Sequence, residues 1–229
     1  MRATEADEQQ LRTLVDDFVV AVERGVPREI AALLCAEEAE SLLDHVDDPD
    51  EYEPIDVTEA VPATIHGIQV FGDIAVVAVN RITDEVKSLY CRRVDGRWLC
   101  CEHAEFDLTA AQLDGAAGDA AERVGALSNV PIGELALAQL CVLVDHGVAR
   151  RNLLPILFRH LDWGRVREDD PAGYVQAVST VFAVDPDYWV ADSESQLRAR
   201  LRAEDVLRDA TDDADDALAR LATEFLAAR

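Results

Sequence analysis

The sequence predicts an α+β protein in which helices come first, an antiparallel sheet follows, and an all-α part completes the chain. Three observations support this fold class. Apolar residues recur at helical spacing up to residue 24, alternate with polar residues from residue 63 to about residue 105, and return to helical spacing after residue 130. With 229 residues, the chain is long enough for two domains of ordinary size.

The first half begins with a helix predicted over residues 6–24. Gly25 stands where a C-cap glycine is expected, and Pro27 suits the first turn of a second helix. The acidic stretch 37–59 contains a short third helical segment. We expect this stretch to be a solvated face, with cation binding or docking of a partner as the alternative. The buried face of the first helix is formed by six apolar residues: Leu11, Leu14, Val15, Phe18, Val19 and Val22.

Two hairpins are predicted from the alternating segment. Residues 64–71 and 74–82 flank Gly72–Asp73, in which the glycine supplies the positive φ of a type II′ turn. Residues 86–94 and 97–105 flank Asp95–Gly96, which is a favoured pair for a type I′ turn. A two-residue loop at this point fixes the register of the second hairpin. The expected cross-strand pairs are Val94–Arg97, Arg93–Trp98 and Cys91–Cys100.

The order of these elements resembles the cystatin-like fold of the nuclear transport factor 2-like superfamily, in which helices pack on a curved antiparallel sheet to form a cone. Two segments carry the resemblance, LRTLVDDFVVAVERGVPREIAALLC and VFGDIAVVAVNRITDEVKSLYCRRVDGRWLC, and they look like small actinobacterial members. The resemblance implies a cystatin-like domain over residues 1–108. Members include isomerases and dehydratases that act inside the cone, and binding or dimerisation modules without chemistry, so the fold leaves the function open.

Four side chains are candidates for acid–base chemistry if this domain is a cone-pocket isomerase or hydratase: His66, His103, Asp56 and Tyr90. Such an enzyme needs a group of shifted pKa that points into a pocket. Alternation along a strand over 97–105 places His103 on the face of Leu99 and Cys101. The simpler expectation is that His66 and His103 make ordinary hydrogen bonds, so no catalytic residue is predicted.

Three cysteines and one histidine near the second hairpin offer the donor types that zinc prefers. Neighbouring strand residues point to opposite faces, however, so Cys100 and Cys101 are not expected to share one metal. No metal and no other cofactor is therefore predicted. Cys91 and Cys100 would form a cross-strand disulfide under oxidation, whereas buried thiols are the favoured alternative. The residues considered are Cys91, Cys100, Cys101 and His103.

An Ala/Gly-rich connector over residues 109–129 leads to an all-α domain predicted for residues 130–229. Helices are expected over 132–146, 148–161 and 171–182, followed by a turn at residues 185–188. A charged tail over 194–229 completes the chain, with an acidic break at residues 211–216.

Residues 130–210 resemble helix-turn-helix regulators of the Cro/C1 type found in actinobacteria. The segment DDPAGYVQAVSTVFAVDPDYWVADSESQLRARLRAEDVLRDA is similar to the C-terminal part of these regulators, which ends in a tail helix used in dimerisation. The resemblance therefore implies a homodimer, with scaffold and recognition helices in ELALAQLCVLVDHGVARRNLLPILFRHLDWGRVRE. The matched positions are Asp170–Pro171, Phe182, Val184, Pro186, Tyr188 and Trp189.

The sequence departs from this family in the segment that would read DNA. A recognition helix presents polar residues to base edges, whereas residues 153–158 are mostly apolar and include Pro155. The basic cluster of the chain surrounds this segment, and its arginines either contact phosphates or, more simply, pair with the many carboxylates. They are Arg150, Arg151, Arg159, Arg165 and Arg167.

Composition restricts the partners further. The chain has 46 acidic and 21 basic residues, and its formal net charge of −25 repels nucleic acid outside the arginine cluster. A polar N-terminus and the lack of a long apolar stretch predict a cytoplasmic protein that does not engage membranes. We expect a non-enzymatic regulatory or interaction protein that binds a protein partner or a small apolar ligand and binds DNA weakly or not at all. The alternatives are the isomerase or hydratase and a purely structural dimerisation module.

Overall fold

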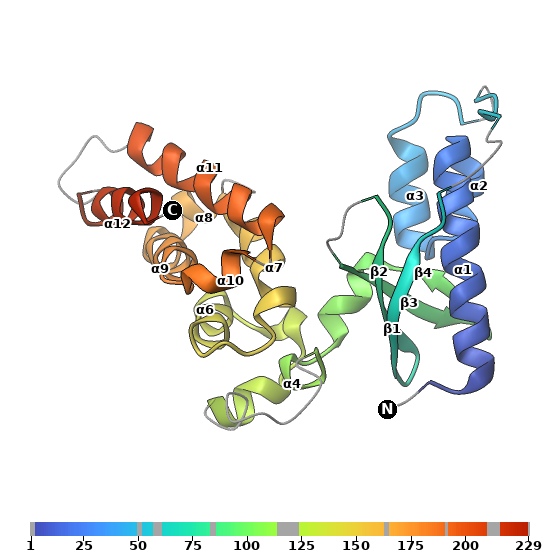
Figure 1. The fold of residues 1–229 in the computed structure, drawn as a ribbon, viewed down its shortest axis with the longest axis horizontal. Helices are drawn as coiled ribbons and strands as arrows, with labels where there is room; N and C mark the ends of the chain where they lie inside the picture. The colour runs from blue at the N-terminus through green and yellow to red at the C-terminus, as the bar shows by residue number, and fades with distance from the viewer. Residues whose placement is uncertain are drawn as a thin grey trace. The chain divides into compact units, whose positions relative to one another are not determined.

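The computed structural model describes residues 3–49, 52–56, 61–82, 86–113, 124–162, 165–190, 192–209 and 216–228. A mixed α+β architecture with one four-stranded antiparallel sheet is confirmed. The chain forms two compact units, Met1–Glu105 and Phe106–Arg229, which are described separately (Figure 1). We call them the α+β unit and the helical unit.

The N-terminal helices begin and end close to the predicted residues. Helix α1 (Glu5–Arg24) is capped by the hydroxyl of Thr4, which accepts a hydrogen bond from the backbone of Asp7, and ends at Gly25 with φ of 68°. Helix α2 (Pro27–Ala31) starts at the predicted proline, and α3 (Ala36–Asp44) follows. The predicted buried face is right in its centre but wrong at Val22, which is 42% exposed because α1 packs with only part of its apolar stripe.

The four strands form two hairpins in the order β1-β2-β3-β4. They are β1 (Thr64–Phe71), β2 (Ile74–Asn80), β3 (Lys87–Val94) and β4 (Arg97–Cys100). Asp95 and Gly96 have φ of 50° and 80°, as a type I′ turn requires. The predicted register is confirmed, because Val94 pairs with Arg97, Arg93 with Trp98 and Cys91 with Cys100.

Two strand ends differ from the prediction. Strand β2 ends at Asn80 instead of residue 82, and β4 ends at Cys100 instead of residue 105. The backbone of Cys100 bonds to Leu33 O at 2.8 Å and receives a bond from Cys35 N at 2.9 Å, so β4 pairs there with the segment before α3. The chain then turns into the 3₁₀ helix η1 (Glu102–Asp107). Strand alternation therefore does not apply to His103.

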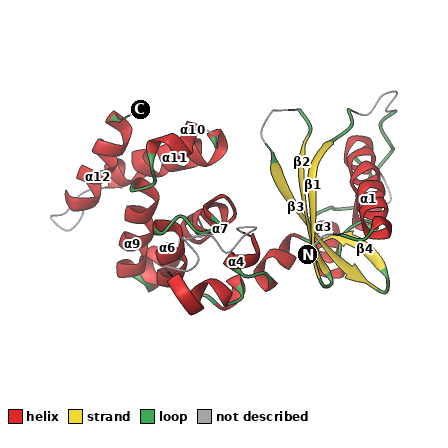
Figure 2. Ribbon diagram, turned by 60° about the horizontal axis from the view of Figure 1, so that its bottom comes forward, coloured by secondary structure: helices red, strands yellow, loops and turns green. Residues whose placement is uncertain are grey.

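Helix α1 covers one face of the sheet, where the core of the α+β unit lies (Figure 2). Each large apolar side chain that is fully buried there stabilises the unit by roughly 1.5–3 kcal/mol. A polar contact also joins α1 to the sheet, since Asp7 accepts hydrogen bonds from Arg93 at 2.7 Å and from Trp98 Nε1 at 3.2 Å. The buried core residues are Leu11, Leu14, Val15, Val70, Ala75, Val77, Cys91, Trp98 and Cys100.

The described residues of the helical unit form helices and turns. The longer helices are α6 (Leu137–Asp145), α7 (Arg150–Asp162), α9 (Pro171–Phe182), α11 (Ser193–Asp209) and α12 (Asp216–Ala227). Shorter ones are α4 (Ala110–Leu113), η2 (Gly125–Asn129), η3 (Ile132–Glu134), α8 (Arg165–Asp169) and α10 (Pro186–Val190).

Three predictions for this unit need correction or lie outside the described residues. The helix expected from residue 132 starts at Leu137, after a separate 3₁₀ turn. The turn expected at residues 185–188 is the start of α10, where the Asp185 carboxylate caps the helix by accepting from the backbone of Asp187 at 2.8 Å. Residues 114–123 of the connector and most of the acidic break, residues 211–215, are not among the described residues.

The core of the helical unit is apolar and centred on α7 and α9. The tail helices join this core: Phe225 of α12 stacks on Phe182 of α9 with ring centroids 5.0 Å apart, and Trp189 of α10 is fully buried. Helices α11 and α12 lie side by side (Figure 1). None of the described helices is both long enough and apolar enough to cross a membrane.

Candidate functional site

Helix α7 occupies the position of the expected recognition helix, and its apolar residues face the core of the helical unit. Each of the five apolar residues between 153 and 158 is at most 1% exposed. The helix continues through Pro155, which lies in its first half. These side chains therefore stabilise the unit and are not available to base edges. They are Leu153, Leu154, Ile156, Leu157 and Phe158.

Arg150, the first of the predicted arginines, begins α7 and is held by the end of α6. Its Nε and Nη2 atoms donate to the carbonyl oxygen of Val144 at 3.1 and 2.9 Å. Its guanidinium also lies 5.7 Å from the centre of the Tyr188 ring. This arginine caps the C-terminus of α6, where a positive charge is favourable.

Two further arginines of the cluster make contacts within the unit. Arg159 lies over the ring of Phe106 at 5.3 Å. Arg167 pairs with Asp209 at 2.6 Å and lies 5.6 Å from the centre of the Tyr174 ring. Arg151 is exposed on α7, and the side chain of Arg165 is outside the described part of the chain. Arg150, Arg159 and Arg167 are thus near one another in sequence but contact different partners.

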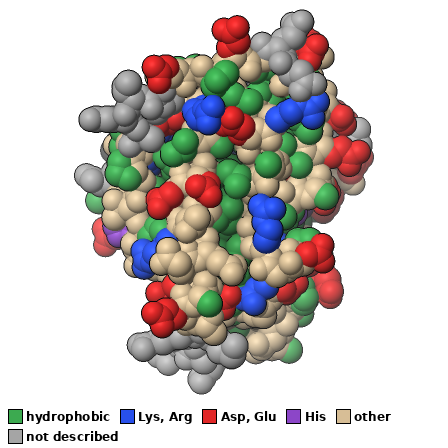
Figure 3. All heavy atoms as spheres, turned by 90° about the vertical axis from the view of Figure 1, so that its right-hand side faces the viewer, with side chains coloured by type: hydrophobic (Ala, Val, Ile, Leu, Met, Phe, Trp, Pro, Cys, Tyr) green, Lys and Arg blue, Asp and Glu red, His purple; other side chains and the backbone are tan. Residues whose placement is uncertain are grey.

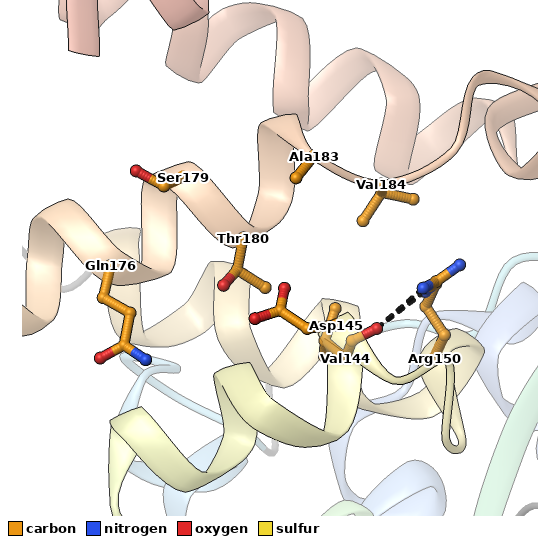
Figure 4. A pocket seen from close by; sticks show the side chains of 8 residues that line it. All are labelled: Val144, Asp145, Arg150, Gln176, Ser179, Thr180, Ala183 and Val184. Atoms are coloured by element: carbon orange, nitrogen blue, oxygen red, sulfur yellow. Dashed lines mark hydrogen bonds between the residues drawn. The ribbon is translucent and has the colours of Figure 1, made fainter. Parts of the chain in front are cut away.

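A shallow pocket of about 470 Å³ lies beside Arg150, between the end of α6 and the face of α9. Figure 4 shows Asp145 and Thr180 in its middle, Gln176 and Ser179 along α9 at one side, and Arg150 at the other. The Ser179 hydroxyl donates to Val175 O at 2.8 Å, within its own helix. The remaining lining residues are Val144, Ala183 and Val184.

The chemistry of this pocket suits binding. A guanidinium at one end and an amide and a carboxylate further along can orient a small polar ligand with an anionic group. Its eight lining residues include no histidine and no cysteine, so they offer neither a thiol nucleophile nor an imidazole base. Sequence reasoning missed Asp145, Gln176 and Thr180, since they lie on two helices whose packing was not predictable.

The four acid–base candidates of the α+β unit lie in different environments. His66 is the extra residue of a β-bulge between Ile65 and Gly67, is exposed, and its Nε2 lies 3.0 Å from Asn80 Oδ1. Asp56 is exposed. Tyr90 is buried on the sheet face opposite to that of its neighbour Cys91, which belongs to the core under α1.

His103 lies in η1 and contacts α3. Its Nδ1 is 3.2 Å and its backbone nitrogen 3.1 Å from Glu38 Oε1, and its side chain is 55% exposed. The pair is an ordinary hydrogen-bonded His–Glu contact at the surface. These contacts agree with the expectation of ordinary hydrogen bonds for His66 and His103. The predicted position of His103 on a strand is wrong, because His103 lies in η1.

All five cysteines are buried free thiols. Cys91 and Cys100 face each other across the second hairpin, as predicted. A hydrogen bond with Cys100, together with burial, raises the pKa of Cys91 well above its usual range. Sequence reasoning did not consider Cys35, although it lies beside Cys101. The missed signal is the spacing Cys35-x-x-Glu38, which places both residues at the start of one helix.

Comparisons of the chain with protein-family models, with curated proteins and with solved structures find no match.

Proposed function

We propose that this is a non-enzymatic regulatory or interaction protein that acts as a homodimer. In this proposal the α+β unit is a cystatin-like binding module for a protein partner or a small apolar ligand. The helical unit is a degenerate helix-turn-helix domain of the Cro/C1 type that supplies the dimer contact. The observation that carries the proposal is a contrast between two helices, because α7 buries its apolar side chains whereas α11 exposes two leucines.

The buried state of α7 argues against sequence-specific reading of DNA. A recognition helix needs donors and acceptors that reach base edges, and the apolar residues of α7 supply none. The contacts of Arg150, Arg159 and Arg167 inside the unit would have to be exchanged for phosphate contacts. Any DNA binding would then rest on charge alone and be weak.

The outward face of α11 supports a dimer contact. Its inner face is buried through Ser195, Ala199 and Ala203, whereas Leu197 and Leu201 are 58% and 52% exposed. These leucines are four residues apart and therefore adjacent on the helix surface. A second copy of the same helix would bury them in an isologous contact.

Charge does not oppose a contact between two copies through α11. Two chains of net charge −25 repel each other, but α11 itself is neutral. It holds four acidic residues, Glu194, Glu204, Asp205 and Asp209, and four arginines, Arg198, Arg200, Arg202 and Arg208. Elsewhere, the face drawn in Figure 3 shows acidic side chains around mixed basic and apolar ones.

Light scattering after size exclusion tests the dimer. We expect the wild-type chain to have twice the mass of its 25.1 kDa monomer. Leu197→Glu and Leu201→Glu should each shift it to the monomer, because a desolvated carboxylate in the contact is strongly unfavourable. Far-UV circular dichroism verifies that both variants are folded.

The matched control is Val175→Glu, since Val175 is 44% exposed on α9 of the same unit. This variant should remain a dimer. A wild-type chain that is monomeric throughout the accessible concentration range would refute the proposed dimer, as would dimers that persist in both leucine variants.

A further inference from the structure

A cluster of metal-ligating side chains lies at the start of α3, apart from the pocket and the dimer surface of the helical unit. Donor atoms of Cys35, Glu38 and Cys101 all lie within 4.8 Å of one another. On sequence grounds, a different group of possible zinc ligands was considered and rejected: Cys91, Cys100, Cys101 and His103. Only Cys101 is common to both groups of ligands.

Backbone pairing brings the two cysteines together. Leu34 forms a parallel bridge with Cys100, and Cys35 N donates to Cys100 O at 2.9 Å. The next residues along each segment, Cys35 and Cys101, therefore lie side by side, with their sulfur atoms 2.7 Å apart. Cys101 does not share the face of Cys100, which belongs to the core under α1. Because Cys100 and Cys101 point to opposite faces, they do not share a metal, and Cys101 instead contacts Cys35.

Glu38 completes the set from one turn further along α3. Cys35 is the N-cap residue of α3 and its side chain makes no capping hydrogen bond. Residues three apart lie on the same side of a helix, so Glu38 is carried over the thiols. Its carboxylate is 17% exposed and is held by the backbone and the ring of His103.

We propose that Cys35, Cys101 and Glu38 bind a zinc ion, with His103 as the outer partner that orients the carboxylate. Two thiolates and a carboxylate are a donor set that zinc accepts, and soft sulfur ligands select it over magnesium or calcium. Tetrahedral coordination at about 2.0–2.3 Å separates neighbouring ligand atoms by roughly 3.3–3.8 Å, so the two sulfurs move apart by about 1 Å when they bind. The remaining position is open to water.

Metal binding at this cluster is coupled to the release of protons. Burial, the adjacent Cys35 and the charge of Glu38 raise the pKa of Cys101 to about 12. Without a metal the Cys101 thiol therefore keeps its proton near neutral pH. Binding of Zn²⁺ replaces the two thiol protons by two zinc–sulfur bonds and releases two H⁺ for each ion. Zinc affinity should accordingly fall as the pH is lowered.

Titration of the full-length, reduced protein with Co²⁺ tests the site, because thiolate ligation gives an intense sulfur-to-cobalt absorption. We expect one Co²⁺ per chain, bound with release of two protons and then displaced by Zn²⁺ with no further release. The absorption should be lost in Cys35→Ala and in Cys101→Ala and retained in the controls Cys91→Ala and Cys141→Ala, whose cysteines are also buried. Circular dichroism compares the folding of the four variants.

Two milder variants keep the test decisive if a cysteine variant fails to fold. Glu38→Gln should weaken Zn²⁺ binding while the thiolate absorption persists at high Co²⁺, and His103→Ala should weaken it about 10–100-fold, as expected for an outer partner. Absence of the absorption in the wild-type protein would overturn the proposal. So would an absorption that survives in both Cys35→Ala and Cys101→Ala, or a reduced protein that takes up no Co²⁺ and instead closes a Cys35–Cys101 disulfide in air.

Discussion

At the scale of single residues, the Asp95–Gly96 turn shows how far local chemistry decides this structure. Both residues have positive φ, and the loop of two residues fixes every pair of the second hairpin. This register was predictable because it depends on two adjacent residues. The His66 bulge was not, since an extra residue in β1 depends on how the whole strand fits β2.

Replacement of Gly96 by valine should destabilise the α+β unit by about 1–3 kcal/mol. The cause is backbone strain alone, because Gly96 has φ of 80° and a Cβ there would meet no atom within 4 Å. Gly67→Val is the matched control, since Gly67 also has open space around it but no positive φ. Denaturant unfolding of both variants measures the difference. Equal stability of Gly96→Val and the wild type would show that a valine at this position does not strain the turn.

Asp7 is the residue whose charge is best placed to affect stability. Its hydrogen bonds with Thr4 and Trp98 and the charge of Arg93 lower its pKa below the ordinary value of 3.8. A group with a lowered folded-state pKa contributes stability above its unfolded value and loses it as the pH falls through the folded value. The contribution of Asp7 is thus complete at pH 5 and above.

We expect Asp7→Asn to reduce the free energy of unfolding at pH 7 by about 1–2 kcal/mol, because charge-assisted hydrogen bonds are weakened. The two proteins should become equally stable well below pH 3.8, where Asp7 is protonated. Urea unfolding at a series of pH values measures this. A difference that stays constant down to pH 2 would show that the charge of Asp7 plays no part.

At the scale of elements, α7 illustrates which part of the candidate site the sequence indicates. Its apolar composition predicts that it is a poor recognition helix, and the burial of Leu153, Leu154 and Phe158 supplies the reason. The partners of the arginines could not be predicted, because Asp209 and Phe106 lie more than 40 residues from Arg167 and Arg159. Strand β4 shows the same limit, since its end depends on Leu33 and Cys35 far away in sequence.

Truncation of one leucine side chain of α7 tests whether this helix forms part of the core. Leu154→Ala should destabilise the helical unit by about 2–5 kcal/mol, since Leu154 is 0% exposed and its removal leaves a cavity. Leu221→Ala on α12 is the same chemical change at a site that is 36% exposed, and it should cost about 1 kcal/mol or less. Thermal unfolding of the two variants compares them. Similar losses would mean that α7 is not the centre of the core.

At the scale of the whole molecule, one acidic chain forms two units of different character. The α+β unit contains the clustered thiols, and the helical unit contains the pocket, the arginines and the exposed leucines of α11. Composition predicted the repulsion of nucleic acid, since a net charge of −25 is a property of the sequence. Which arginines can contact phosphates depends on how the side chains pack. This packing cannot be predicted from a local sequence pattern.

We propose above that the helical unit serves interaction and does not read DNA. Fluorescence anisotropy with labelled duplexes of several sequences, at salt concentrations from about 50 to 200 mM, tests it most directly. We predict no binding, or weak binding that is equal for all sequences, falls steeply with salt, and loses about one unit of salt slope when Arg151 is replaced by alanine. Tight binding to one sequence that survives physiological salt would contradict the account.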